Sequence, residues 1–315
     1  MVLKASKRGE RVVSIYNYGK WTTFDARLPT TPFDSMKKIV FTVIVFLISL
    51  QGFSKDEIKK SGNKGKFYLY WGWNRATYSN SDINFSGNNY NFTLDNVIAK
   101  DRQSPVDLGL YLNPATVTIP QVNYRLGYFF KEIYSLSIGV DHMKYVVVQD
   151  QVVNINGSIN ESGTEYDGVY QNEPIAIKAN FLMFEHTDGL NYINLSLRRH
   201  DNIYSLKRIG LKHGSINTIL GVGSGILLPR TNTTLLKNER YDEFHLSGFG
   251  LDLTCGVNIT LGKWFFIQSE LKGGFIDMPD IRTTQYSSDK AKQYFGFVQA
   301  NIIVGASFRL TAEKE

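Results

Sequence analysis

The sequence has a single cysteine, Cys255, in 315 residues. One thiol excludes an internal disulfide framework and a zinc site made of cysteine ligands. The five histidines show no metal-ligand spacing, so we expect no metal ion, and no motif indicates an organic cofactor. These histidines are His142, His186, His200, His213 and His245.

Prolines and long apolar runs are also scarce. The chain has only 8 Pro, against 27 Gly, 18 Tyr and 20 Phe, and this balance favours a sheet-rich protein. Beyond residue 54, no apolar run reaches the roughly 18 residues that a membrane-spanning helix needs. Alternation with a period of two recurs instead, so we predict an all-β protein.

The net charge of the whole chain is +6, but most of the chain is nearly neutral. Residues 1–54 hold eight Lys/Arg and three Asp/Glu, which leaves 27 basic and 26 acidic residues in the remainder. The basic balance therefore belongs to the leader, and charge gives no support to a nucleic-acid partner.

The leader contains a signal-peptide pattern. The run MKK at 36–38 precedes twelve uncharged apolar residues, 39–50, and small residues follow at Gly52 and Ser54. These are the three regions of a secretory signal peptide, which we assign to 36–54. A short membrane anchor is the alternative, but twelve helical residues span only about 18 Å, less than the roughly 30 Å hydrocarbon core.

The residues before this pattern have no expected fold. Since a signal peptide belongs at an N-terminus, translation that begins at Met36 is the simplest account of the sequence. We therefore expect 1–35 to be a non-native or disordered extension, with residues 55–315 forming the folded protein.

The clearest alternation lies in 263–275, KWFFIQSELKGGF. Phe265 and Ile267 fall on an apolar face, whereas Glu270 and Lys272 fall on the other face, and aromatics crowd the end nearest the turn. This pattern is typical of a membrane-spanning strand, with its apolar face toward lipid and its polar face toward a lumen.

Similar alternation predicts ten strands. They are 66–78, 118–130, 133–149, 174–185, 191–200, 203–212, 216–228, 244–260, 263–275 and 294–310. A small hairpin over 83–94 would raise the count to twelve if it joined the same wall.

Short connections between these strands alternate with long ones, as in outer-membrane barrels with short periplasmic turns and longer outside loops. We therefore predict a transmembrane antiparallel up-and-down β-barrel over 55–315, located in a bacterial outer membrane. Its expected partners are outer-membrane lipid, including lipopolysaccharide, and the barrel-assembly machinery, and we expect a monomer. Arg230, Lys237 and Arg240 in the loop 229–243 are candidate contacts for lipid phosphates, although a solvated loop is the simpler interpretation.

Parity along the strands places charged side chains inside the barrel. We predict lumen-facing positions at Arg125, Asp141, Lys178, Arg198, Asp252, Glu270, Lys272 and Arg309. Both signs are present, so we expect ion pairs across the lumen, and ten strands are too few for a porin-like channel. The glycines at 221, 223 and 225 lack the helix and lysine of a phosphate loop, and indicate close packing of strands.

Seven segments resemble uncharacterised outer-membrane β-barrel proteins of Bacteroidota-type Gram-negative bacteria. They are GKFYLYWGWNRA (65–76), DRQSP (101–105), IPQVNYRLGYF (119–129), DHMKY (141–145), FEHTDGLNY (184–192), LPRTNTTLL (228–236) and ELKGGFIDMP (270–279). The resemblance covers about 65–310 and implies fold and location, but no activity and no catalytic residues.

Two functions are compatible with a barrel, and a soluble periplasmic β-sandwich is the alternative to the barrel itself. The first is a barrel without enzymatic activity, with a structural, adhesive, small-ligand-binding or narrow-pore role. The alternative is a barrel enzyme acting on lipid or peptides through a His/Asp/Ser site around His142 or His186, with Ser196 or Ser215 as nucleophile. Against it, Asp188-Gly189 is ordinary hairpin chemistry, and parity places it at the periplasmic rim.

Overall fold

The computed structural model describes residues 3–4, 12–17, 20–25, 62–104, 109, 121–211 and 213–310. The predicted signal peptide, 36–54, lies outside the described residues. Within 1–35 the chain forms a small antiparallel sheet of β1 (Leu3–Lys4), β2 (Val12–Asn17) and β3 (Lys20–Asp25). The described part of the chain contains no helix long and apolar enough to cross a membrane.

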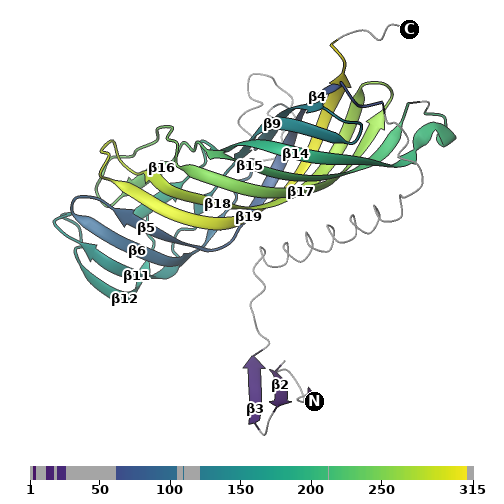
Figure 1. The fold of residues 1–315 in the computed structure, drawn as a ribbon. Coiled ribbons are helices and arrows are strands. Elements are labelled where there is room, and N and C mark those ends of the chain that lie inside the picture. The colour runs from purple at the N-terminus through teal and green to yellow at the C-terminus, as the bar shows by residue number, and fades with distance from the viewer. Residues whose placement is uncertain are drawn as a thin grey trace.

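Eight antiparallel strands close into a ring, because the last strand pairs with both its predecessor and the first (Figure 1). The ring strands are β4 (Phe67–Tyr78), β8 (Val122–Phe129), β9 (Tyr134–Met143), β14 (Leu190–Ser205), β15 (Ser215–Leu227), β17 (Gly248–Leu261), β18 (Phe265–Arg282) and β19 (Lys290–Phe308). A barrel of this size has an interior just wide enough for side chains.

The predicted ten-strand count is wrong for the described ring. Segment 174–185 leaves the wall and is divided between β12 (Gly168–Ala176) and β13 (Leu182–Glu185). Segment 203–212 is the end of β14 followed by a short 3-10 turn, η1 (Leu206–Ile209). The hairpin over 83–94 does form, but it joins the ring through the outer end of β19 and does not become part of the wall.

The remaining strands form a cap on the long-loop end of the ring. One layer extends the ring sheet from β19 through β5 (Ser81–Ser86), β6 (Tyr90–Val97), β11 (Val152–Ile159) and β12 (Figure 1). The other layer is a separate sheet of β7 (Ala99–Lys100), β10 (Val146–Val147), β13 and β16 (Asn232–Leu235). Apolar side chains join the layers, with Phe85 against Phe184 and Phe92 against Phe181 at ring centroid distances of 5.4 and 5.8 Å.

The two ends of the ring differ in their connections. Three short turns, 130–133, 206–214 and 262–264, share one end with residues 62–66 and the C-terminal end of β19. The four connections that build the cap lie at the other end. Because 174–185 is not a wall strand, the expected parity is wrong for the segment 186–189, which belongs to the long-loop end.

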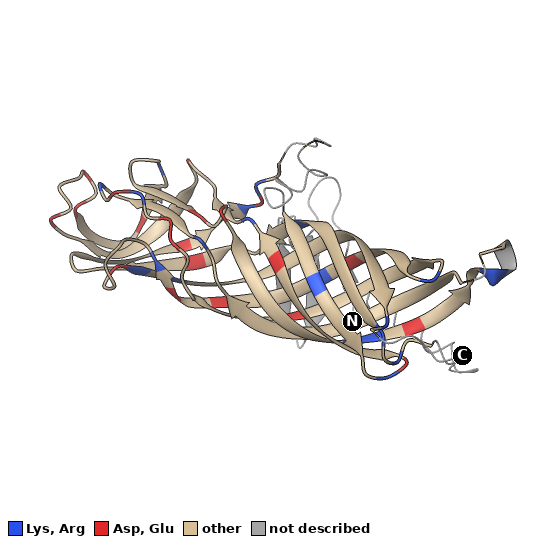
Figure 2. Ribbon diagram, turned by 90° about the horizontal axis from the view of Figure 1, so that it is seen from above, with Lys and Arg blue, Asp and Glu red and all other residues tan. Residues whose placement is uncertain are grey.

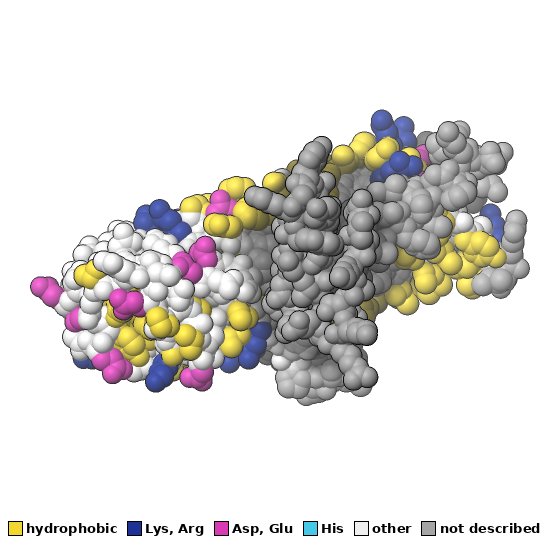
Figure 3. All heavy atoms as spheres, turned by 90° about the horizontal axis from the view of Figure 1, so that it is seen from below, with side chains coloured by type: hydrophobic (Ala, Val, Ile, Leu, Met, Phe, Trp, Pro, Cys, Tyr) yellow, Lys and Arg dark blue, Asp and Glu magenta, His cyan; other side chains and the backbone are white. Residues whose placement is uncertain are grey.

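An apolar belt surrounds the ring, with exposed side chains from every ring strand. Examples, exposed by 42% to 63%, are Leu69, Leu126, Ile138, Leu195, Val222, Leu253, Ile267 and Ile302. On β18 the belt runs from Phe265 to Phe275, about 25 Å in height for a strand tilted by about 40°. Hydrophobic atoms cover the visible ring surface, whereas polar and charged atoms dominate the cap, and few charges lie in the ring wall (Figures 2 and 3).

The interior of the molecule has two storeys of opposite polarity. Inside the belt most inward side chains are polar, as at Gln268, Glu270 and Lys272 of β18, and a small buried cluster that includes Phe266 and Ile303 lies beside them toward the short-turn end. Above the belt the inward positions of the same strand become apolar, beginning with Ile276 and Met278, both fully buried. The long ring strands therefore reverse their amphipathic character where they enter the cap, whose apolar core is continuous with the barrel interior.

Candidate functional site

The polar storey contains two buried ion pairs that cross the lumen. Arg198 of β14 pairs with Glu270 of β18, and Lys272 of β18 pairs with Asp141 of β9. All four side chains are about 1% exposed. Burial removes the hydration of these charges, so each pair is stable only while both partners are present and hydrogen-bonded.

Arg125 of β8 links the two ion pairs. Its Nε donates to the Tyr70 hydroxyl at 2.9 Å, and its Nη2 donates to Asn194 Oδ1 at 2.6 Å. Asn194 in turn donates to Asp141 at 2.9 Å, while the Tyr70 hydroxyl donates weakly to Glu270 at 3.5 Å. The guanidinium thus connects β4 with β14, two strands of the ring that do not pair with each other.

Charge inside the ring is balanced. Three cations, Arg125, Arg198 and Lys272, face three carboxylates, Asp141, Asp252 and Glu270, all at most 3% exposed. Asp252 accepts a hydrogen bond from the Tyr192 hydroxyl at 2.9 Å and one from Thr254 at 3.2 Å. A balanced set that is held by direct contacts leaves no fixed field of one sign to attract an ion through the lumen.

The glycines of β15 make room for this network. A Cβ atom at Gly223 would meet the Asp252 carboxylate and the Ser196 hydroxyl, and one at Gly221 would approach the Arg198 side chain at 3.1 Å. The prediction of close strand packing at these glycines is confirmed.

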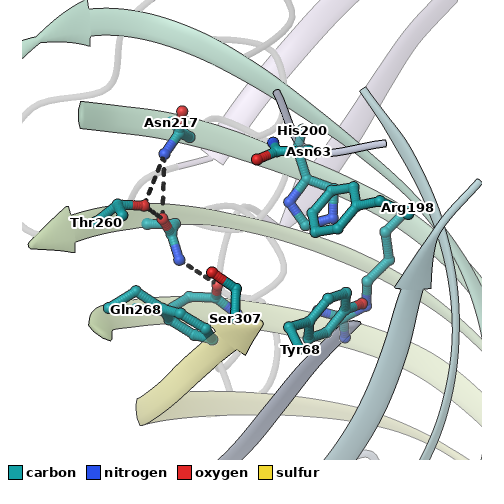
Figure 4. Close-up of a pocket in the computed structure, with 11 residues that line it drawn as sticks. Asn63, Tyr68, Arg198, His200, Asn217, Thr260, Gln268 and Ser307 are labelled. Atoms are coloured by element: carbon teal, nitrogen blue, oxygen red, sulfur yellow. Dashed lines mark hydrogen bonds between the residues drawn. The ribbon is translucent and has the colours of Figure 1, made fainter. Parts of the chain in front are cut away.

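A small cavity of about 50 Å³ lies at the short-turn end of the lumen. One wall is a hydrogen-bonded chain in which Asn217 donates to Thr260 and to Asn258, and Asn258 donates to Gln268 (Figure 4). The rings of Tyr68 and His200 and the side chain of Arg198 lie opposite (Figure 4). The cavity is far smaller than the roughly 300–1,000 Å³ of small-molecule pockets, and part of its lining is Arg198, whose guanidinium is held by Glu270.

The apolar storey holds one buried histidine, His186, at the junction of three cap segments. The Gln293 amide of β19 donates to its Nε2 at 3.0 Å, which makes that nitrogen the acceptor, and Nδ1 then donates to Thr231 at 2.9 Å. Burial against Tyr145 and Phe184 lowers the pKa of His186 to about 3. The ring is therefore neutral and serves as a structural connection.

The predicted catalytic groupings are not assembled. His186 contacts a threonine and an amide, and His142 contacts Asn191 at 2.8 Å, so in the described part of the chain neither histidine is hydrogen-bonded to a carboxylate. Ser196 is buried in the polar storey, where it accepts from Arg125 at 3.0 Å. Ser215 only accepts from the Asn217 amide, at 3.1 Å.

One histidine–carboxylate pair does form, at a position that the sequence did not single out. His245 Nε2 lies 2.9 Å from Asp280 Oδ2, at the long-loop end, where both side chains are part-exposed. Across the described chain, no group of three or more His, Cys, Asp or Glu side chains could hold a metal ion.

Six of the eight positions predicted to face the lumen lie in the polar storey. They are Arg125, Asp141, Arg198, Asp252, Glu270 and Lys272. Lys178 does not, because its segment turns between β12 and β13 and leaves the side chain exposed on the cap. Arg309 follows the end of β19, and its exposed guanidinium donates to the Gly62 carbonyl at 2.9 Å at the short-turn rim.

Several members of the network were not predicted as site residues. Tyr70, Tyr192, Asn123 and Asn194 connect the charged groups, with Asn123 donating to Asp141. Strand alternation alone could have predicted these four residues, because each lies on the same face of its strand as a predicted charged residue or another polar residue. All eight predicted positions carry Lys, Arg, Asp or Glu, whereas the network is completed by uncharged amides and phenols.

No protein-family model matches the sequence, and no curated protein matches it either. Solved structures that are similar in part include the outer membrane protein AlkL, with 12% identity over 80% of this chain and 94% of that one, at a TM-score of 0.37. OprG of Pseudomonas aeruginosa has 11% identity over 80% and 100%, at 0.35. Neisserial surface protein A has 10% identity over 75% and 98%, at 0.29. These likenesses are too low to assign a function.

Proposed function

We propose that this chain is a closed, non-conducting outer-membrane barrel that anchors a folded cap at the cell surface. The observation that carries the proposal is the two-storey interior, in which a polar hydrogen-bonded network fills the lumen and an apolar core closes it from above. The belt of about 25 Å supports the membrane location, since it matches the apolar band of outer-membrane barrels. A Bacteroidota-type Gram-negative source is part of the same proposal.

A charge placed in the belt tests the membrane location. Ile302 lies opposite Ser269, near the middle of the belt, and Ile302→Arg should lower the free energy of unfolding in lipid vesicles by about 2–4 kcal/mol, because arginine is costly at the bilayer midplane. Val152→Arg is the control, since Val152 is even more exposed but belongs to the cap. Denaturant unfolding of both variants makes the comparison, and an equally small effect for the two would contradict a membrane-embedded belt.

Conductance in a planar lipid bilayer tests the closed lumen. We expect the inserted protein to produce no unitary current steps in 1 M KCl, because no continuous water path passes two buried ion pairs and an apolar core. A separate gel assay verifies that the barrel is folded, because unboiled folded protein and boiled unfolded protein migrate at different rates. Steady current steps from correctly inserted protein would support the narrow-pore role instead.

An enzymatic role is the alternative, and the His245–Asp280 pair is the observation that favours it. A carboxylate can orient a histidine as a general base. However, the nearby Ser247 hydroxyl donates to the backbone carbonyl of His245 at 3.2 Å, so it does not occupy the position of a nucleophile. Phospholipid hydrolysis that disappears in His245→Ala would establish this alternative.

The partners of the barrel follow from the proposed location. Outer-leaflet lipid, including lipopolysaccharide, surrounds the belt, and the barrel-assembly machinery inserts the chain. A monomer suffices, because the ring closes without a second chain.

A further inference from the structure

Four inward side chains of the polar storey carry buried polar atoms that have no hydrogen-bond partner among the described residues. They are Gln299 and Asn301 of β19, Asn74 of β4 and Arg198 of β14, all at most 2% exposed. The six unpaired atoms are both amide atoms of Gln299 and of Asn301, Oδ1 of Asn74 and Nε of Arg198. Buried polar atoms in folded proteins nearly always have a partner, so this group requires an explanation.

The six atoms are grouped around the Glu270 carboxylate. Register places Asn301 directly opposite Glu270 on β18 and opposite Asn74 on β4, and Gln299 lies two positions away on the same face of β19. Arg198 reaches the same carboxylate from β14 through its two Nη atoms. Three strands of the ring therefore bring unpaired donors and acceptors to one part of the lumen.

Existing hydrogen bonds fix the direction of two of these atoms. Asn74 Nδ2 donates to Asn123 Oδ1 at 2.7 Å and to the His142 carbonyl at 3.2 Å, so the Asn74 Oδ1 atom points away from both. Both Nη atoms of Arg198 face Glu270, which leaves its Nε as a remaining donor. Rotating either group would break contacts that the network already has.

Donors and acceptors occur in equal numbers among the unpaired atoms. The donors are Gln299 Nε2, Asn301 Nδ2 and Arg198 Nε, and the acceptors are Gln299 Oε1, Asn301 Oδ1 and Asn74 Oδ1. Exchanging N and O in either amide of β19 leaves this balance unchanged. A cation would satisfy only the acceptors and an anion only the donors, whereas water both donates and accepts. The neutral charge of the storey likewise calls for no ion.

The cavity at the short-turn end provides room for water beside this group. Arg198 lines it together with Gln268, whose Nε2 donates to Glu270 at 2.7 Å (Figure 4). The cavity volume of about 50 Å³ exceeds the roughly 10–15 Å³ that one water molecule requires. Asn63 and Ser307, both half-buried, also line the cavity, so it is open to water at the short-turn rim.

We propose that the polar storey binds ordered water at two sites, one in the cavity beside Arg198 and one between Asn301, Gln299 and Asn74. Both sites adjoin the Arg198–Glu270 ion pair, and the apolar storey closes the lumen beyond them. The lumen is then hydrated from the short-turn end only, with no continuous water path through the barrel. This inference goes beyond the proposed function, because it depends on contacts inside the ring and not on the location of the protein.

Magnetisation transfer from water to side-chain amides in solid-state NMR tests the proposal. Full-length protein in lipid vesicles is measured at short mixing times, at which only amides in contact with water gain signal. We expect the amide groups of Asn301 and Gln299 to gain signal several-fold faster than that of Asn194. Asn194 is the matched reference in the same storey, since its Nδ2 already donates to Asp141 and to the Tyr192 carbonyl.

A substitution at the second site links the signal to the unpaired atoms. Asn301→Leu should slow the transfer to Gln299 several-fold, because leucine has a similar volume but offers no hydrogen bond to water. Asn154→Leu, on the exposed face of cap strand β11, is the control and should leave the transfer unchanged. Both variants must show the heat-dependent gel shift of the folded barrel, and Gln299→Met, measured at Asn301, replaces Asn301→Leu if that variant does not fold.

Two results would overturn the proposal. Transfer to Asn301 and Gln299 that is as slow as transfer to Asn194 would mean that these amides pair with protein groups. Equally fast transfer to all three would mean that water fills the lumen throughout and is not held at particular sites. The conductance measurement remains a separate test, because water sites that end below the apolar storey carry no current.

Discussion

Replacing Arg198 with methionine should lower the free energy of unfolding by about 3–5 kcal/mol, because it leaves the Glu270 carboxylate buried without its cation. Methionine preserves most of the side-chain volume, so loss of packing contributes little. The measurement is equilibrium unfolding of the inserted protein in denaturant. The effect should be among the largest of any single substitution, since both partners are about 1% exposed.

The next residue supplies the control. Arg199 points to the opposite side of β14 and pairs with Asp201 at 2.8 Å, but its side chain is 42% exposed. Arg199→Met should cost less than about 1 kcal/mol, as for exposed ion pairs. The double variant Arg198→Met/Glu270→Leu should recover most of the lost stability, because it removes both buried charges. Equal effects for Arg198→Met and Arg199→Met would show that the lumen is hydrated well enough to screen the pair.

Alternation was sufficient to predict which side of each wall strand faces inward. The pattern in 263–275 places Glu270 and Lys272 together, and the sheet pleat then directs both into the lumen. The identity of their partners was not available from this pattern. Asp141 and Arg198 are 131 and 72 residues away from them in sequence, so their meeting depends on ring closure.

The strand count could not be predicted from alternation. In 174–185 the apolar positions Ile175, Ile177 and Phe181 have the same period as a lipid-facing strand, but they pack against or within the cap core. A period of two records that one face is apolar, and it does not distinguish lipid from the interior of a second layer. The error in parity for His186 followed from this ambiguity.

The cap was not predicted from the sequence, for a related reason. The polar stretches 79–117 and 150–173 were expected as long loops, with only a small hairpin over 83–94 in the first, because Asn, Asp, Ser and Gly are frequent in them. Their apolar residues alternate regularly, for example at Ile83 and Phe85, and this alternation forms the inner face of the extended sheet. The polar composition of these segments predicted loops, whereas the alternation of their apolar residues indicates strands. The structure shows that the alternation was the better guide.

Acid should loosen the cap while the ring remains folded. His186 has its pKa lowered from 6.5 to about 3 by burial, so the unfolded cap binds a proton more readily than the folded one. The stability that neutral His186 provides is complete above pH 6.5 and is lost as pH falls toward 3. The expected loss is about 2 kcal/mol at pH 5 and roughly twice that near pH 3.5.

Limited proteolysis between pH 7.5 and pH 4 measures this effect, since cleavage in the cap reports its opening. His186→Gln keeps an uncharged hydrogen-bonding side chain, and the cap of this variant should show a weaker dependence on pH over the same interval. The exposed His213 at the short-turn end gives the matched control, because His213→Gln should leave the pH dependence of the cap unchanged. Protonation at Nε2 also breaks the hydrogen bond from Gln293, which connects the cap to β19. The opening should therefore begin where the cap joins the ring, and cleavage that starts at the β5–β6 tip instead would contradict this account.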